Sequence, residues 1–283
     1  MATDPITQTT AAKLLSEIWA NQPEYAVNNS RGFTKSIWDT GEQYIGPGYL
    51  VHIPIVGSMS ATAVGAAMSA GVGTTLAPTE TEITATPTVV YTSVRILEDV
   101  LLTTAYDTVR TYTPALAESL YQQMDIDGLS LYAGFTSNTS TDAADFTLAT
   151  FQGLVSKIMS NGGDKVQLGQ LDGWYHPLKW DSIMSIGDMN SASIRGEDNS
   201  SAKTGNVGTA FGVNFNFTKN VQTSTSLRNL IVSKKSMILV RKNRPKIEME
   251  RSDLVTNVVA STMYAIVVLH EATGGEHRIT TTT

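Results

Sequence analysis

The chain contains no cysteine. Disulfide bonds, zinc–thiolate sites and cysteine nucleophiles are therefore excluded. Charged residues are also scarce, at 16% of 283 residues, whereas about a quarter is usual in globular domains. This indicates that something other than water covers much of the surface. The net charge of -6 argues against a protein that holds nucleic acid over its whole surface, because phosphate binding depends on lysine and arginine.

Catalytic and metal-binding motifs are missing as well. The sequence has no phosphate-binding loop, no dinucleotide-binding fingerprint and no nucleophile elbow. Asp125, Asp127 and Gly128 resemble the start of a calcium loop, but its third acidic ligand and distal glutamate are absent. No two histidines have the helical spacing of a zinc protease site; they are His52, His176, His270 and His277. We expect no enzyme, no cofactor and no metal site.

Membrane and secretory segments are not expected either. Residues 56–77 are uncharged and about as long as a membrane span, but their glycines, serines and threonines make them too polar. The first thirteen residues have no positive stretch followed by an apolar run.

The most regular pattern predicts a long helix over residues 113–134. Thr113 and Pro114 are typical of a helix start, and Gly134 of a helix end. The apolar face is broad, and Asp127 at its edge is expected to be a paired structural carboxylate. Ile126 and Leu129 lie on the opposite face, which favours a helix that is contacted on both sides. The alternative is an ordinary core helix with two stray apolar residues.

An uncharged hairpin is predicted before this helix. Residues 43–79 contain no Asp, Glu, Lys or Arg. Val51, Ile53 and Ile55 share one side of a strand that Pro54 restricts to an edge position. Residues 83–97 also alternate, and a tip of small residues that includes Ala66 and Ala67 joins the two strands. Because such a hairpin would promote aggregation in a monomer, we expect it to lie on another subunit.

The remaining patterns predict an α+β fold. Helices are expected at residues 148–163 and around Pro177, the latter with Trp180, Ile183 and Met184 inward, and a mobile loop at 195–208. Strands are expected at 211–217, 230–240 and 263–269, the last apolar on both faces and therefore central. Residues 9–25 form a short helical pattern, and its Trp19 indicates docking onto its own body or a neighbour's. The first half and the last third should share a sheet.

The order of these parts resembles the major capsid proteins of tailed bacteriophages, whose fold also builds encapsulin shells and the floor of herpesvirus capsids. Each stretch alone is a weak motif, and the shared order is the specific part. The stretches that carry the resemblance are Glu17–Trp19, Gly48–Pro54, Thr81–Val100, Ala115–Tyr132, Thr204–Val221 and the two final apolar strands.

The resemblance implies a division of the chain. Residues 1–42 would form an N-terminal arm and residues 43–97 an extended β-hairpin loop. Residues 98–146 and 228–283 would form a peripheral domain around the spine helix at 113–134, and residues 147–227 an inserted axial domain.

The resemblance also implies self-assembly through pentamers and hexamers into an icosahedral shell in the virion. The shell would form in the host cytoplasm and enclose double-stranded DNA without sequence-specific binding, with scaffolding, portal and decoration proteins as partners. No membrane would take part. Some family members weld subunits through a lysine on the extended loop, but no lysine lies between Lys35 and Lys157. We therefore expect noncovalent contacts.

Candidate assembly-interface residues follow from the patterns and the resemblance together. The basic run from Arg228 to Arg251 holds eight of the twenty basic residues. It fits a salt-bridged subunit contact and contact with nucleic acid equally well. The candidates are Trp19, Val51, Ile53, Ala66, Ala67, Arg95, Asp127, Arg241 and Arg244.

Two alternatives remain open. An encapsulin-like compartment would have the same fold with a cellular cargo. A phage or cell-surface adhesion domain would suit the Thr, Ser and Gly content, and would be a small oligomer that binds glycans.

Overall fold

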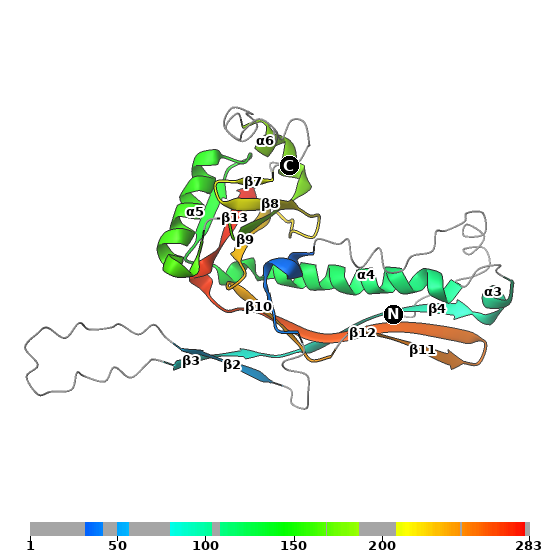
Figure 1. Ribbon diagram of the computed structural model, residues 1–283. Coiled ribbons are helices and arrows are strands. Elements are labelled where there is room, and N and C mark those ends of the chain that lie inside the picture. Colours follow the sequence, from blue (N-terminus) through cyan, green and yellow to red (C-terminus); the bar gives the residue numbers. More distant parts are fainter. Residues whose placement is uncertain are drawn as a thin grey trace, which may run out of the picture.

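The computed structural model describes residues 32–41, 50–56, 80–103, 108–167, 169–186, 208–243 and 245–280. These residues form a long helix on a long sheet, with a compact second sheet at one end (Figure 1). Several predictions lie outside the described residues. They are the helix at 9–25 with Trp19, the hairpin tip with Ala66 and Ala67, residues 195–207 of the mobile loop, and Arg244.

The long sheet is built around β12 (Val255–Val268), which has 14 residues. The path runs β1 (Trp38–Asp39), β10 (Met237–Arg241), β12 and β11 (Lys246–Ser252), and β4 (Thr88–Leu97) also pairs with β12. Met263↔Val89 and Leu239↔Ile266 show that strands flank β12 on both edges. The prediction of a central strand at 263–269 is confirmed.

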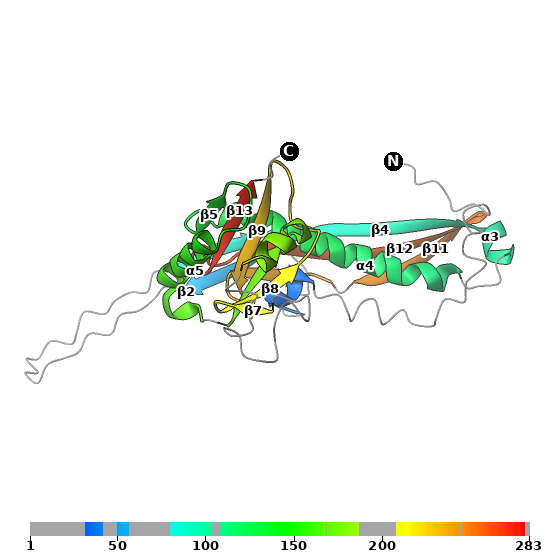
Figure 2. The same ribbon diagram turned by 90° about the horizontal axis from the view of Figure 1, so that it is seen from above.

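The long helix α4 (Thr108–Leu129) covers one face of this sheet, as Figure 2 shows from above. A short helix, α3 (Glu98–Thr103), precedes it and a 3-10 turn, η3 (Ser130–Gly134), continues it. Leu116, Leu120 and Met124 point into the core. The helix starts before the predicted Thr113, so Pro114 lies inside it. Packing against the sheet outweighs the one hydrogen bond that proline removes.

At its carboxyl end α4 has a second neighbour, η2 (Phe33–Ser36). Phe33 and Leu129 are fully buried in one cluster, whereas Ile126 stays exposed. The prediction of contacts on both sides is therefore confirmed for this end of the helix.

The base of the hairpin consists of β2 (Val51–Val56) and β3 (Glu80–Ala85), paired antiparallel with Val51 opposite Ala85. The single strand predicted at 83–97 is wrong. The structure has two strands there, separated by Thr86 and Pro87, because β3 pairs with β2 whereas β4 pairs with β12.

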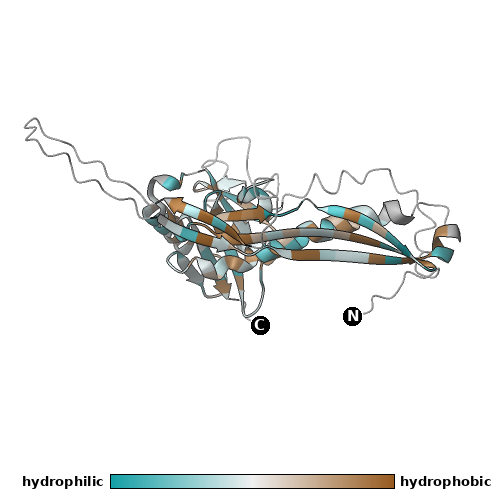
Figure 3. Cartoon of the chain, turned by 90° about the horizontal axis from the view of Figure 1, so that it is seen from below, coloured by the Kyte–Doolittle hydropathy of each residue, from teal (hydrophilic) through white to brown (hydrophobic). Residues whose placement is uncertain are grey.

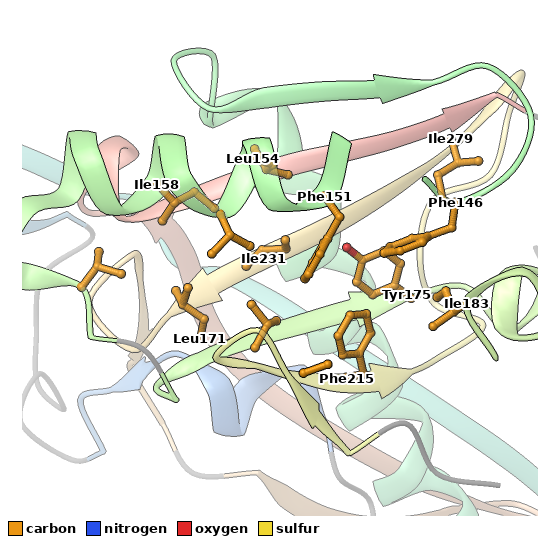
Figure 4. Packing of buried hydrophobic residues seen from close by; sticks show 14 residues of the cluster. Phe146, Phe151, Leu154, Ile158, Leu171, Tyr175, Ile183, Phe215, Ile231 and Ile279 are labelled. Atoms are coloured by element: carbon orange, nitrogen blue, oxygen red, sulfur yellow. The ribbon is translucent and has the colours of Figure 1, made fainter. Parts of the chain in front are cut away.

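The compact sheet has six strands in the order β5 (Thr139–Asp142), β13 (Gly274–Thr280), β9 (Ser226–Ser233), β6 (Leu171–Tyr175), β8 (Val213–Phe217), β7 (Thr209–Ala210). Helices α5 (Leu148–Gly162) and α6 (Trp180–Met184) pack on it. Figure 4 shows Phe151, Leu154 and Ile158 of α5 pointing toward Leu171, Tyr175 and Phe215 of the sheet. Short 3-10 turns complete it: η4 (Gly163–Lys165), η5 (Pro177–Lys179) and η6 (Glu271–Thr273).

Three predictions here need correction. The helix predicted around Pro177 is only the 3-10 turn η5 followed by the short α6, and Gly173 and Trp174 just before it pair with β9 as strand. The predicted strand at 230–240 is interrupted by a turn in which the Ser236 amide donates to the Ser233 carbonyl at 3.0 Å. Trp180 is exposed, whereas Ile183 points inward as expected.

Candidate assembly surfaces

The face of the long sheet opposite α4 is covered by β2 and β3 at β10, whereas along β4 it carries exposed side chains among the described residues (Figure 3). Val90 and Val94 pack toward the helix, so the alternation of a strand turns Val89, Tyr91 and Arg95 to the open face. Val89 and Tyr91 are 63% and 70% exposed. An aromatic side chain left in water on a flat sheet is typical of a contact surface.

Strand register divides this open face into two parts. Tyr91 lies opposite Ser261 and Val89 opposite Met263, so these four residues of one part are uncharged, and Lys246 of β11 borders them beside Ser261. Arg95 lies opposite Asn257, whose other neighbour is Glu250 of β11, so the second part is charged. We call the part around Val89, Tyr91 and Met263 the uncharged sheet patch.

Val51 and Ile53 do not lie on such a surface. Both are buried, and they pack with Ile238 and Val240 of β10 inside the same chain. The other side of β2 faces outward and carries His52, which forms an ion pair with Glu82. The alternation predicted for this strand is confirmed, but the chain itself covers its apolar side.

Asp127 is paired within the chain, as the sequence predicts. It accepts hydrogen bonds from the Tyr264 hydroxyl at 2.6 Å and from Gln123 Nε2 at 2.8 Å. Burial and the bond to Asp127 raise the pKa of Tyr264. Both carboxylate oxygens are used, so Asp127 acts here as a structural link between α4 and β12.

Three of the described basic residues in the run that follows Arg228 form ion pairs inside the chain. Arg241 lies 2.8 Å from Asp39, which joins β10 to β1. Lys246 lies 2.7 Å from Glu248, and Arg251 contacts Glu98. Ion pairs of this exposed kind contribute at most about 1 kcal/mol each.

A hollow of about 900 Å³ lies between η2, α4 and the turn from β9 to β10. Lys35, Lys234 and Lys235 line it together with Asp39 and Asp125. Burial raises the pKa of Asp125 to about 6, although the Thr34 and Phe33 amides and the charge of Lys35 act in the opposite direction. The Asp125 carboxyl group is therefore half-protonated at about pH 6 and mostly ionised at pH 7.

The sequence candidates therefore do not form one site. Trp19, Ala66, Ala67 and Arg244 lie outside the described residues. The others are dispersed: Val51 and Ile53 in the core below β10, Arg95 on the open sheet face, Asp127 between α4 and β12, and Arg241 beside the hollow.

A buried polar cluster in the compact sheet was not predicted. Asp142, Tyr175 and His277 are almost completely buried. His277 Nε2 lies 2.9 Å from Asp142 Oδ2, and the Tyr175 hydroxyl lies 3.1 Å from His277 Nδ1. With Asp142 ionised, Nε2 carries the proton and Tyr175 donates to Nδ1.

This cluster joins three strands rather than forming a reaction site. Burial alone would raise the pKa of Asp142, but hydrogen bonds from His277, Thr150 and the Thr147 amide hold it at about 2. Asp142 and His277 lie 135 positions apart in the sequence, and Tyr175 and His277 lie 102 positions apart. No local sequence pattern could therefore reveal the cluster. Phe146 and Phe151 rings pack on His277 and leave no route for a substrate.

Among the residues that the structure describes, no group of three or more His, Asp or Glu side chains could hold a metal ion. Within the same ranges, no helix is long and apolar enough to cross a membrane.

Comparison with known proteins gives a clear result for the fold. No family model and no curated protein matches the sequence. A chain in the capsid structure of the Cyanophage P-SCSP1u superposes with a TM-score of 0.69 and 14% identity, over 87% of both chains. A chain in the mature capsid of bacteriophage PhiM1 gives 0.66 and 10% identity, over 89% of this chain and 87% of that chain.

The chain has the fold of the tailed-phage major capsid proteins. The capsid fold extends over the long sheet, α4 and the compact sheet, so the resemblance seen in the sequence is confirmed for the fold. The virus-like particle from Pyrococcus furiosus shares the capsid fold as well, with a TM-score of 0.58 and 10% identity over 89% of this chain and 94% of that chain. At such low sequence identity, the roles of individual residues in these proteins are not transferred to this chain.

Proposed function

We propose that this chain is a major capsid protein that self-assembles through pentamers and hexamers into an icosahedral shell in a virion. The observation that carries the proposal is the superposition on a phage capsid chain over 87% of both chains. A fold shared over nearly the whole length leaves little room for an added catalytic unit. The role is therefore structural rather than enzymatic.

The extended loop would lie over the adjacent subunit and land on the uncharged sheet patch. The loop residues 43–79 contain no Asp, Glu, Lys or Arg, and the patch around Tyr91 is uncharged too. Joining two uncharged surfaces avoids the cost of removing ions from water. Many such contacts per subunit make the shell durable although each contact is weak.

The domain division is also a proposal, with limits adjusted to the strand pairing. We place the end of the extended loop near Thr86 and Pro87, since β4 belongs to the long sheet. The axial domain would comprise the six-stranded sheet with α5 and α6, and so include β5, β9 and β13 in addition to most of residues 147–227. The peripheral domain would comprise α4 and the long sheet.

The cargo would be double-stranded DNA, enclosed without sequence-specific binding. The net charge of -6 supports weak contact with DNA, because a strongly basic wall would hold the phosphates. Scaffolding, portal and decoration proteins would be partners, and assembly would take place in the host cytoplasm.

Nuclease protection tests the cargo directly. Particles purified from cells that express the chain with its neighbouring genes are treated with nuclease, and the protected nucleic acid is measured. We expect double-stranded DNA that becomes digestible only after the particles are opened. Particles that protect no DNA under these conditions would contradict the proposal.

One observation supports a second candidate, the encapsulin-like compartment. The virus-like particle from Pyrococcus furiosus also superposes, with a lower TM-score of 0.58. A copurifying enzyme in place of DNA would establish this alternative. Nothing in the described residues favours the adhesion domain.

A further inference from the structure

The axial domain has a shallow uncharged hollow on its surface. Its volume is about 770 Å³. Gln152, Ser156, Met159 and Ser160 of α5 form one wall, and Phe211 and Gly212 of the turn between β7 and β8 form the other. None of these side chains is charged. We call this surface the axial hollow.

Phe211 is held at the hollow in an unusual backbone conformation. Ala210 and Val213 pair across a two-residue turn, and both turn residues have positive φ, 51° at Phe211 and 77° at Gly212. Such turns favour Asn or Gly at their first position, because a side chain with a bulky ring is strained there. Phe211 is 41% exposed, and the rest of its ring packs edge-on against Phe151 of α5, with 6.4 Å between the ring centroids. The ring therefore links the turn to the core and also presents an apolar edge to the hollow.

A protruding apolar feature lies elsewhere on the same domain. Leu178 on η5 is 65% exposed and Trp180 at the start of α6 is 40% exposed. The turn that carries them is fixed: the Leu178 amide donates to His176 Nδ1 at 3.2 Å, and Lys179 Nζ lies 3.1 Å from Asp145. We call Leu178 and Trp180 the axial knob.

The hollow and the knob lie at opposite ends of the same pair of strands. Parallel pairing places Leu171 beside Val213 and Tyr175 beside Phe217. The turn at Phe211 precedes Val213, so it lies at the amino end of β6, whereas η5 follows the carboxyl end. The five residues of β6 separate the two features by about 16 Å. Figure 1 shows α5 and α6 on different sides of the unit.

We propose that the axial knob of one subunit inserts into the axial hollow of the next, and that this contact closes the rings. The inference rests on the proposed function and adds the residues of the contact. Two unlike surfaces at opposite ends of one domain allow copies of the chain to join head to tail, which is the arrangement that closes a ring. Because the hollow is uncharged, binding of Leu178 and Trp180 there involves no desolvation of a charged group.

The size of the contact favours a ring over an isolated dimer. A stable pair of proteins buries about 800 Å² on each partner, whereas one aromatic and one leucine side chain bury only a few hundred. A single contact of this kind is too small to hold two free subunits. In a closed ring every subunit makes two such contacts, in addition to those of the loop and the sheet.

Cysteine crosslinking tests the pairing, because the natural chain has no cysteine. The variant with Met159→Cys and Leu178→Cys is assembled, oxidised and separated on a denaturing gel without reductant. We expect a ladder that ends at the ring size. Each single variant should give no more than dimers, and the pair Met159→Cys with Thr225→Cys, which is exposed but lies off the knob, should also stop at dimers.

A second variant separates assembly from folding. Phe211→Asn places the residue that the turn favours beside Gly212 but removes the ring contact with Phe151. Because these two effects oppose each other, the urea midpoint of the free subunit should stay close to that of the natural chain. The yield of rings and shells should fall at least tenfold. Normal shells from Phe211→Asn, or shells of the cysteine pair without a ladder, would overturn the inference and leave the proposed function intact. If the natural chain forms no ring at all, both fail.

Discussion

Single residues reveal where the parts of the chain meet most closely. A Cβ atom on Gly128 of α4 would lie 2.5 Å from Phe33 Cε1, closer than real contacts allow. A Cβ atom on Gly153 of α5 would meet nothing within 4 Å. The turn η2, which carries Phe33, is therefore fitted to α4 at Gly128.

Two alanine substitutions test this fit. Gly128→Ala should lower the free energy of unfolding by about 1–3 kcal/mol, because Phe33 must move. The matched control Gly153→Ala should raise it by about 0.5–1 kcal/mol, because alanine favours a helix more than glycine does. Urea unfolding of the unassembled subunit measures both. Equal effects of the two changes would show that Phe33 does not pack against Gly128.

Asp125 predicts a dependence of stability on pH. Its pKa rises from 3.8 to about 6 on folding, so the folded state binds a proton more tightly than the unfolded chain. The stabilisation is complete below about pH 4 and is lost as the pH rises through about 6. Asp125→Asn should remove this loss and stabilise the subunit at pH 8 by about 1–3 kcal/mol.

The measurement is the urea midpoint at pH 4.5 and pH 8 for both proteins. If the urea midpoint of the natural chain does not fall between pH 4.5 and pH 8, the result would contradict the raised pKa of Asp125.

Sequence reasoning succeeds for residues whose partners follow from a pattern. Asp127, at the edge of an apolar helix face, was predicted to be paired, and Tyr264 supplies the pairing. His277 carries no such signal, because its partners Asp142 and Tyr175 come from distant strands. Alternation placed Val51 and Ile53 together, but it cannot tell whether their own chain or a neighbour covers them.

At the scale of elements, periodicity finds helices and strands but not their partners. The strand predicted at 83–97 alternates throughout, yet β3 and β4 enter different sheets at Pro87. Pro114 signals a helix start and lies inside α4, because tertiary packing outweighs a local signal. The strand at residues 171–175 was not predicted, and only its pairing with β8 and β9 defines it.

The hairpin carries the prediction at this scale. Ala67→Asp should leave the stability of the free subunit within about 0.5 kcal/mol. It should stop shell closure, because the added charge would be buried against the adjacent subunit. Ala67→Ser is the uncharged control and should form shells. Microscopy of assembly reactions measures the outcome, and normal shells from Ala67→Asp would show that the hairpin is not a subunit contact.

At the scale of the whole molecule, the order of parts predicted more than any single motif. An uncharged hairpin, a long helix, a helical insert and closing strands fit one known α+β arrangement, and the superposition on phage capsid chains confirms the fold. The prediction that the first half and the last third share a sheet is confirmed by β1 and β4, which join β10, β11 and β12. The strands of the compact sheet could not be predicted. β5, β9 and β13 join the compact sheet from segments that lie far apart in the sequence.

The long sheet and hairpin also explain the scarcity of charge. Val89 and Tyr91 of the sheet patch are exposed and apolar, and residues 43–79 contain no charged residue. Such a surface is a liability in a free monomer and an advantage in a shell where neighbours cover it.

Negative-stain microscopy of the protein, expressed alone and then with its neighbouring genes, tests the central claim most directly. We predict closed shells, or capsomer rings where partners are missing. A monomer or trimer of uniform size under both conditions would contradict the assignment as a capsid protein, although the fold would stand.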